Sequence, residues 1–334
     1  MNKLISGIVP VKMLLVVGFS TAVVLAVFGI NLAAPLNKVN LIGRASDSPL
    51  PLARTVVAPT PTPEPTPTPT PIPTATPTPA PTSTPKPTPK PTIPPLSGPP
   101  GTGLTRASVA TPKGNFSATI LTVDLNSSRM ITDTGNDGNC GDGCNVLSLS
   151  EYVSRNGGYA GVNGTYFCPA TYPDCAGKTN SYDFPVYNTR LNHWINQDKL
   201  FWGERRAIVY VDGGGAHYLH NANSFSGSLT AGIVNYPGLV DGSNVQIDES
   251  QSGLSDKQRA KGTKVGIGIR NAHTVMVVVA ANVNMREFAE VFKSLGATGA
   301  MNLDTGGSTA LISGGKYVYG PGRALPNAVI FAAK

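Results

Sequence analysis

Apolar and polar residues alternate along several short stretches of the C-terminal part of the chain, and this pattern predicts strands. In Phe116–Leu125, apolar side chains recur at alternate positions, as expected for a strand with one buried face. Two apolar runs within Lys264–Ala281 flank a short break near Asn271, which predicts a β-hairpin. Further strands are predicted at residues 159–167, 207–211, 299–303, 310–312, 317–319 and 328–332.

Two other segments have the spacing of an amphipathic helix. The first follows Ser148, has Glu151 in the position that completes a capping box, and ends at Gly157. The second follows Asn284 and places four apolar side chains on one face, namely Phe288, Val291, Phe292 and Leu295. Because strands outnumber helices, the pattern predicts a single α+β domain with a mixed or antiparallel sheet and few helices at residues 104–334.

The first hundred residues have a different composition from this domain. Residues 13–36 are apolar and uncharged, and they are long enough to span a bilayer as a helix, with residues 1–12 in the cytoplasm. A cleaved signal peptide is the alternative, and on either interpretation the chain beyond this segment is exported. Residues 37–103 contain a dense Thr-Pro alternation, which predicts a disordered, extended linker between the membrane and the domain.

The net charge of +7 gives no reason to expect a nucleic-acid partner. Much of the excess positive charge lies before Gly101, where Asp47 and Glu64 are the acidic residues and the basic ones are Lys3, Lys12, Lys38, Arg44, Arg54, Lys86 and Lys90. A nucleic-acid-binding domain would instead concentrate basic residues on its own folded surface.

The four cysteines fall into two close pairs, Cys140 with Cys144 and Cys168 with Cys175. Zinc sites usually have a C-x2-C spacing or nearby histidines, and an exported chain meets oxidising conditions, so disulfides are favoured over a metal site. Four cysteines allow three connectivities, and the sequence does not choose among them. The Asp- and Gly-rich segment around Cys140 does not fit the calcium-loop pattern, so no metal and no cofactor is predicted.

One stretch, residues 301–311, combines chemistry with turn-forming residues. An apolar run leads to Asp304, two glycines and two hydroxyl residues before the apolar pattern resumes. A strand followed by such a turn would place one carboxylate beside exposed backbone N–H groups. The local pattern fits an ordinary tight turn equally well.

Five segments follow one another in an order that resembles the phosphodiester glycosidase family. They are VLSLSEYVSRNGGYAGVNGTYF, KVGIGIRNAHTVMVVVA, a helix that ends in SLGA, MNLDTGGSTAL and GRALPNAVIF. This family includes the domain of the lysosomal uncovering enzyme and of bacterial exported proteins linked to exopolysaccharide biosynthesis. The resemblance covers most of residues 116–334.

The resemblance implies hydrolysis of a sugar 1-phosphodiester, typically an α-linked N-acetylglucosamine phosphate, in an envelope or extracellular polysaccharide. It implies catalytic roles for Asp304, Asn163 and Arg323. It implies substrate contacts at Gly164, Tyr166, Thr263, Lys264, Gly306, Gly307, Ser308 and Asn327. Two positions depart from the family pattern: Thr305 replaces a loop glycine, and an arginine expected before Thr263 is missing, for which Arg259, Lys261 or Lys264 are possible substitutes.

The chemistry of a phosphodiester fits this set of residues. A phosphate monoester leaves readily, so one carboxylate can replace the usual pair of glycosidase carboxylates. Arg323 and the N–H groups of Gly306–Gly307 would hold the phosphate. Asp304 would act as a base for water or stabilise positive charge, and Asn163 would bind sugar hydroxyls or orient Asp304.

Other classes of protein fit parts of the sequence. A noncatalytic glycan-binding domain could retain the same fold after losing the family arginine. Leu303–Gly306 also matches the aspartic-protease triplet, but that chemistry needs two aspartates, and the roughly thirty residues after Asp304 are too few for the remaining barrel. Trp194, Phe201 and Trp202 could stack on a sugar ring, although burial is the more common position for aromatic side chains.

Overall fold

The computed structural model describes residues 98–202, 206–248, 250 and 253–334. The predicted cytoplasmic N-terminus, the predicted anchor and residues 37–97 of the predicted linker lie outside these residues. Within the described part, no helix has both the length and the apolar character needed to cross a bilayer.

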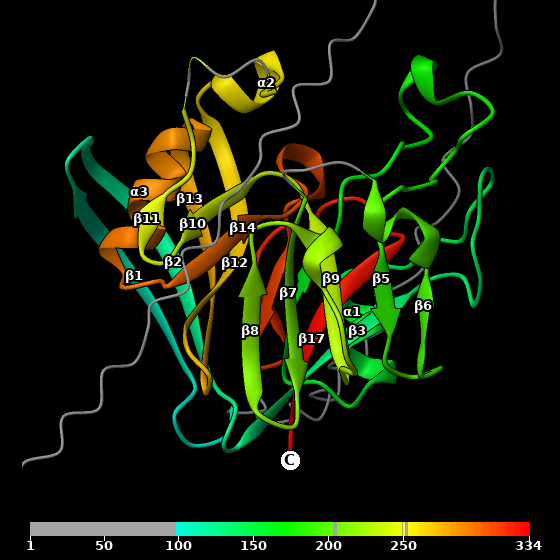
Figure 1. Ribbon diagram of the computed structural model, residues 1–334, viewed down its shortest axis with the longest axis horizontal. Coiled ribbons are helices and arrows are strands. Elements are labelled where there is room, and N and C mark those ends of the chain that lie inside the picture. The colour runs from blue at the N-terminus through cyan, green and yellow to red at the C-terminus, as the bar shows by residue number, and fades with distance from the viewer. Residues whose placement is uncertain (1–97, 203–205, 249, 251–252) are drawn as a thin grey trace, which may run out of the picture. The chain divides into compact units, whose positions relative to one another are not determined.

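The largest sheet has seven antiparallel strands (Figure 1). In spatial order they are β1 (Gly103–Thr111), β2 (Gly114–Asp124), β13 (Thr274–Val283), β12 (Gly262–Asn271), β14 (Gly299–Asn302), β10 (Gly238–Asp241) and β11 (Asn244–Val245). The predicted hairpin forms its centre, where Val265 faces Val279 and the apolar runs of both strands are buried. The alternation of buried residues along β2 confirms the strand predicted at Phe116–Leu125.

Two five-stranded sheets complete the described part of the fold, and their neighbouring strands pair antiparallel. The second sheet has the order β16 (Lys316–Tyr319), β15 (Leu311–Ser313), β4 (Ala160–Asn163), β17 (Asn327–Ala333) and β3 (Ser128–Thr134). The third has the order β6 (His193–Ile195), β5 (Val186–Asn188), β9 (Ala231–Asn235), β7 (Ala207–Asp212) and β8 (Gly215–Leu219).

One hydrophobic cluster joins the three sheets. It contains Val277 from the first sheet, Val329 from the second and Ile233 from the third, all fully buried. The burial of branched apolar residues on facing strands provides the main driving force for this arrangement.

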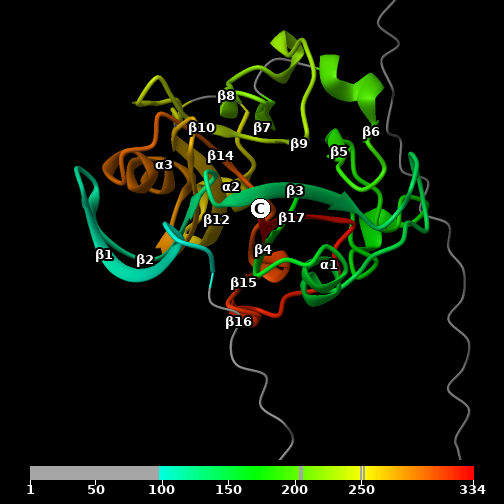
Figure 2. The same ribbon diagram turned by 90° about the horizontal axis from the view of Figure 1, so that it is seen from below.

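Helices cover the outer faces of the first two sheets (Figure 2). Helix α3 (Met285–Ser294) begins at the capping box of Asn284 and Glu287, and its predicted apolar face packs on the seven-stranded sheet. Helix α1 (Leu149–Arg155) begins at the predicted Ser148 cap and covers the second sheet. Short helical turns are α2 (Asp256–Arg259), η1 (Pro173–Cys175), η2 (Gln197–Phe201), η3 (Ala222–Ser224) and η4 (Gly306–Ser308).

The described residues confirm the α+β class and an antiparallel architecture, with more strands than the sequence predicted. Strands β1, β3, β5, β6, β9, β10 and β11 were not expected. The predicted strand at residues 159–167 is shorter, because it ends at Asn163, where the chain turns toward the loop of Cys168.

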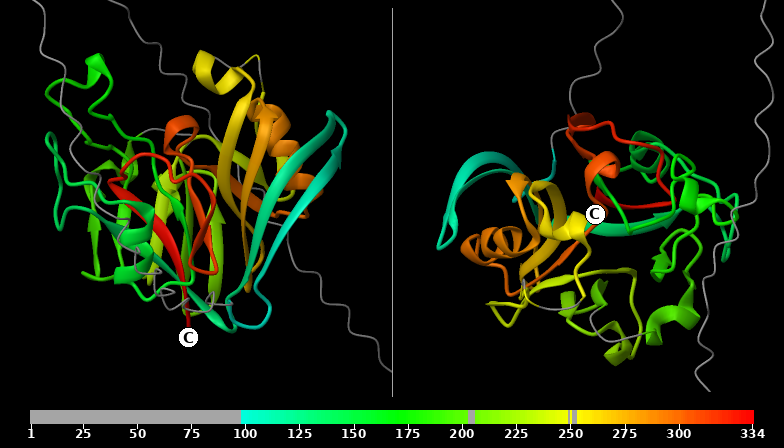
Figure 3. Two further views of the ribbon diagram at one scale, coloured as in Figure 1. Left: turned by 180° about the vertical axis from the view of Figure 1, so that it is seen from behind. Right: turned by 90° about the horizontal axis from the view of Figure 1, so that it is seen from above.

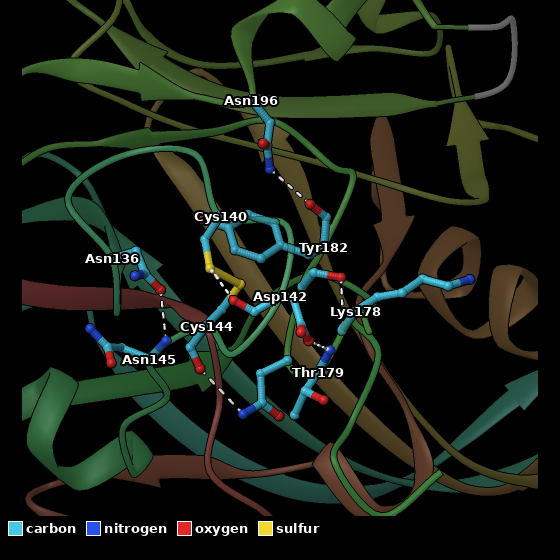
Figure 4. The surroundings of a disulfide bond; sticks show 11 residues. Asn136, Cys140, Asp142, Cys144, Asn145, Lys178, Thr179, Tyr182 and Asn196 are labelled. Atoms are coloured by element: carbon cyan, nitrogen blue, oxygen red, sulfur yellow. Dashed lines mark hydrogen bonds between the residues drawn. A yellow bond between two sulfur atoms is a disulfide. The ribbon is translucent and has the colours of Figure 1, made fainter. Parts of the chain in front are cut away.

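Both predicted disulfides are present, with the connectivity Cys140–Cys144 and Cys168–Cys175. The loop of Cys140 and Cys144 is joined to the turn that follows the second loop, since Cys144 N–H donates to Thr179 O at 3.0 Å (Figure 4). Asn180 Nδ2 also donates to Cys144 O at 3.2 Å. The two loops therefore support one another beside the third sheet.

The connection from β14 to β15 passes from the first sheet to the second and contains η4. Figures 1 and 3 show this short helix, in orange, at the same end of the sheets as α2, in yellow, and the bright green loop of residues 168–175. Three segments that are distant in the sequence therefore meet at one end of the domain.

Candidate active site

A cleft of about 350 Å³ lies at the end of the sheets where these segments meet. This volume falls within the range of small-molecule sites. Its lining residues are Tyr166, Phe167, Pro169, Tyr172, Tyr236, Ser255, Lys257, Gln258, Asp304, Thr305, Ser308 and Arg323.

Asp304 provides the carboxyl group of the cleft. Its backbone N–H donates to Gly164 O at 2.9 Å, and its Oδ1 accepts the Thr305 N–H at 2.9 Å. The residue is only 8% exposed. Burial raises the pKa of Asp304 to about 7, although hydrogen bonds from Ser308 and Thr305 and the positive charge of Arg323 favour the ionised form. The carboxyl group can therefore exchange a proton near neutral pH.

Asn163 lies behind Asp304 and does not line the cleft. Its Nδ2 donates to Asp304 O at 2.7 Å, and its Oδ1 accepts the Ala310 N–H at 3.0 Å. The buried amide thus joins β4 to both ends of the Asp304 loop. Of the two roles predicted for Asn163, orientation of Asp304 matches these contacts, while a contact with sugar hydroxyls does not, because the side chain is fully buried and does not line the cleft.

Gly164 and Asn327 also support the site from behind. The Thr165 N–H donates to Asn327 Oδ1, and Asn327 Nδ2 donates to Thr165 Oγ1, both at 2.9 Å. A Cβ atom on Gly164 would lie 1.8 Å from Asn327 Oδ1, so only glycine fits this contact. Neither Gly164 nor Asn327 lines the cleft, so their positions do not match the direct substrate contacts that the resemblance implied.

Tyr166, for which the resemblance implied a substrate contact, forms one wall of the cleft. Its hydroxyl accepts from Asn302 Nδ2 at 2.7 Å and from Gln258 Nε2 at 3.3 Å. Burial, with the nearby negative charge of Asp304, raises the pKa of Tyr166 to about 12, so the phenol keeps its proton at neutral pH. Thr305, which stands where the family has glycine, also lines the cleft.

Two cations flank one aromatic ring at the mouth of the cleft. Lys257 Nζ lies 4.8 Å from the centroid of the Tyr172 ring, and Arg323 Cζ lies 5.2 Å from it. Among the described residues, neither cation has a carboxylate within ion-pair distance. The Cys168–Cys175 disulfide closes the loop that carries Tyr172. The mouth therefore presents two positive charges that are available to an anion.

The glycine pair of the Asp304 loop makes room for Arg323. Gly306 has a φ of +70°, which favours glycine, and the Arg323 N–H donates to Gly307 O at 3.0 Å. A Cβ atom on Gly307 would lie 2.4 Å from Arg323 Nη2. The guanidinium thus lies directly against the loop, and Ser308, the third residue predicted here, lines the cleft.

A methyl group at position 307 should therefore displace the guanidinium while leaving the fold intact. We expect Gly307→Ala to raise the KM for an anionic substrate by about tenfold, with a small loss of stability, because the displaced atom is the end of a flexible side chain. Steady-state kinetics and thermal unfolding would measure the two effects. Gly138→Ala, which adds a methyl group in open space, is the matched control; equal KM values for the two variants would contradict the predicted contact.

The predicted substrate contacts at Thr263 and Lys264 are not in the cleft. The Thr263 hydroxyl shares a hydrogen bond with the Tyr319 hydroxyl at 2.9 Å. Lys264 Nζ donates to Lys257 O at 3.0 Å and to Ala260 O at 3.1 Å, and burial lowers the pKa of Lys264. Its ammonium group is therefore used to fix the carbonyl end of α2.

Arg259 and Lys261 do not line the cleft, so neither of them replaces the missing family arginine there. Lys261 instead pairs with Glu287 at 2.8 Å. Besides Arg323, the cation that lines the cleft is Lys257, which the sequence analysis did not single out. A capping box of Ser255 and Gln258 marks α2 in the sequence and could have revealed the helix, but not its position.

A second Asp-Thr-Gly triplet, Asp133–Gly135, occurs in the chain and bears on the aspartic-protease alternative. Asp133 is fully buried at the end of β3, where Arg155 Nε and Asn156 Nδ2 each donate to its Oδ2 at 2.7 Å. It does not line the cleft of Asp304. Two aspartates that share a proton are therefore not present at this site.

The described residues contain no group of three histidine, cysteine, aspartate or glutamate side chains arranged to hold a metal ion. The polar groups of the cleft are one buried carboxyl, three phenols, three aliphatic hydroxyls, an amide and two cations that have no ion-pair partner among the described residues. A carboxyl with a raised pKa in a cleft marks a candidate functional site, and the two cations provide positive charge for an anion.

The chain belongs to the phosphodiester glycosidase family, because the model of that family matches residues 156–332, which is more than half of the chain. This confirms the resemblance found in the sequence. The comparison with curated proteins gave no match.

One solved structure agrees with this assignment at the level of the fold. The catalytic domain of zebrafish N-acetylglucosamine-1-phosphodiester alpha-N-acetylglucosaminidase, auto-inhibited by its pro-peptide, is 14% identical with a TM-score of 0.53. That match covers 70% of this chain and 83% of the zebrafish domain. A hypothetical protein from Synechocystis is 13% identical with a TM-score of 0.48, over 70% of this chain and 62%, less than two thirds, of that protein.

Proposed function

We propose that this protein hydrolyses a sugar 1-phosphodiester, with an N-acetylglucosamine phosphate as the model substrate. The observation that carries the proposal is that the buried Asp304 carboxyl lines the same cleft as Arg323 and Lys257, two cations without carboxylate partners among the described residues. The family and the zebrafish enzyme support the same chemistry.

In the proposed reaction, Arg323 and Lys257 bind the phosphate oxygens while the sugar lies over Asp304. The C1–O bond breaks, and the electron pair leaves with the phosphate, which needs no proton because a phosphate monoester is a weak base. Asp304 takes a proton from water, and the water oxygen forms the new bond to C1. Positive charge that develops on the sugar is stabilised by the carboxylate.

Hydrolysis in water labelled with oxygen-18 distinguishes this C1–O cleavage from the P–O cleavage of an ordinary phosphodiesterase. The full-length protein would be incubated with N-acetylglucosamine 1-(methyl phosphate), and the products analysed by mass spectrometry. We expect label in the free sugar and none in methyl phosphate, because water attacks carbon. Label in the phosphate would mean P–O cleavage and would contradict the proposal, and binding of the diester without turnover would favour the noncatalytic glycan-binding alternative.

The pH dependence of kcat/KM should report Asp304. Burial raises the pKa of this carboxyl to about 7, and only its ionised form can accept a proton, so kcat/KM should rise about tenfold per pH unit below 7 and level off above it. Tyr166, with a pKa of about 12, should not titrate in this range. Rates measured from pH 5 to 9 would test this, and a limb that falls between pH 6 and 8 would instead indicate an acid role.

We further propose that the domain acts outside the cytoplasm on a cell-envelope or extracellular polysaccharide, attached to the membrane through residues 13–36. The uncharged apolar segment and the Pro-rich stretch after it support this placement. Two disulfides in a small domain also fit an oxidising compartment.

A further inference from the structure

A second aromatic ring outside the cleft repeats the arrangement found at Tyr172. Lys199 Nζ lies 5.3 Å from the centroid of the Trp202 ring, and Arg206 Cζ lies 6.0 Å from it. Trp202 is 50% exposed and its neighbour Phe201 is 67% exposed, so burial, which the sequence favoured for both, is wrong here. At Trp194 burial is confirmed in part, since its ring packs edge-on against Tyr187 and Phe225.

A row of side chains connects this ring to the cleft. The Arg206 guanidinium lies 4.6 Å from the centroid of Phe184, and the rings of Phe184 and Tyr166 are 6.2 Å apart. Tyr166 is a wall of the cleft. The exposed surface at Trp202 is therefore linked to the wall of the cleft by contacts through Arg206 and Phe184.

The cations beside Trp202 leave positive charge on this surface. Lys199 pairs with the Asp183 carboxylate at 2.5 Å. Arg206 donates from Nη1 to the Asp183 backbone oxygen at 3.1 Å and has no carboxylate ion partner within the part of the chain that is described. One carboxylate thus faces two cations, and Arg206 keeps capacity to bind an anion.

We propose that Trp202, Arg206 and Lys199 form a second subsite, which binds the adjoining repeat of a sugar–phosphate polymer whose scissile unit occupies the Asp304 cleft. This inference rests on the proposed function. The indole face packs on the C–H face of a sugar ring, and Arg206 binds the phosphate that links it to the next unit. The repetition of one aromatic ring with two cations at both positions matches the repetition of sugar and phosphate in such a polymer.

Kinetics on a short and a long substrate test the subsite in the full-length protein. N-acetylglucosamine 1-(methyl phosphate) reaches only the cleft, whereas an oligomer of poly(N-acetylglucosamine 1-phosphate) reaches Trp202 as well. We expect Trp202→Ala to raise the KM for the oligomer by about tenfold while kcat/KM for the methyl diester stays within about twofold. Trp202→Phe should have a KM for the oligomer close to that of the wild type. Leu104→Ala, which removes another exposed apolar side chain on β1, is the matched control and should change neither.

Binding of the oligomer to the Asp304→Asn protein separates this proposal from the proposed function, because it does not require turnover. Tenfold weaker binding after adding Trp202→Ala would support the subsite even if the wild type hydrolysed neither substrate. Equal binding with and without Trp202, or no binding by either protein, would overturn it while leaving hydrolysis of the methyl diester to be judged separately. Equal affinity for a neutral N-acetylglucosamine oligomer would overturn the phosphate assignment. Binding to phosphatidylglycerol vesicles that needs Trp202, with oligomer binding unchanged, would assign this surface to the membrane instead.

Discussion

Asp304→Asn is expected to lower kcat for a sugar 1-phosphodiester by about 10³-fold, because the amide cannot accept the proton from water. The same change should stabilise the protein at pH 8. Burial raises the pKa of Asp304 from 3.8 to about 7, so the folded state disfavours the ionised form. The stability associated with the protonated carboxyl is present in full below pH 4 and is lost as the pH rises from 4 to 7. A neutral amide avoids this loss, and we expect a gain of roughly 2 kcal/mol at pH 8.

Single-turnover kinetics and urea unfolding at pH 5 and pH 8 would measure both effects. The stability gain should be smaller at pH 5, where less of the carboxyl is ionised. Asp133→Asn is a useful contrast, because this buried aspartate is paired with Arg155 and its loss should destabilise the protein by about 3 kcal/mol. A fully active Asp304→Asn protein would contradict the assignment of the base, and an equal stability at both pH values would contradict the raised pKa.

Arg323→Ala is expected to reduce kcat/KM by about 10²-fold. Arg323→Lys should show most of the same reduction, since lysine keeps the charge but not the bidentate geometry. Lys257→Ala should cost about tenfold, because its charge lies at the exposed edge of the same anion site. Both losses should appear with the methyl diester and should be larger at low salt.

Lys261→Ala provides the matched control for removal of a positive charge. Lys261 lies two residues after α2 but pairs with Glu287 outside the cleft, so its loss should leave kcat/KM within about twofold. An effect of Lys261→Ala equal to that of Lys257→Ala would show that the charge acts at long range. In that case the proposed contact of Lys257 with the phosphate would be wrong.

The parts of the fold that were predicted from the sequence are those with long and regular patterns. The hairpin of β12 and β13 has ten residues in each strand, and α3 has a capping box and a continuous apolar face. Strands such as β5 and β6, with three residues each, are too short for a period to be recognised. Strand β1 is almost entirely exposed, so it lacks the apolar alternation of a half-buried strand.

The candidate site was predicted in part for a related reason. Asp304 and Arg323 could be found because family motifs mark them, and Tyr166 follows a strand end. Motifs do not distinguish a residue that faces the cleft from one that supports it, so Asn163 and Asn327 had the same sequence signal as Tyr166. Lys257 belongs to a single helical turn, whose place is fixed by the Lys264 ammonium group, a tertiary contact with no local signal.

Asp304 lies on a different segment of the chain from Lys257 and Tyr172, and this affects how the domain can diversify. The carboxyl is held by a connection between two sheets, where most changes would disturb the core. The two residues at the mouth belong instead to one helical turn and one short disulfide-closed loop at the surface, which tolerate insertion and replacement far better. New substrate preferences can therefore arise through exchange of two small surface segments, while the reacting centre is inherited unchanged.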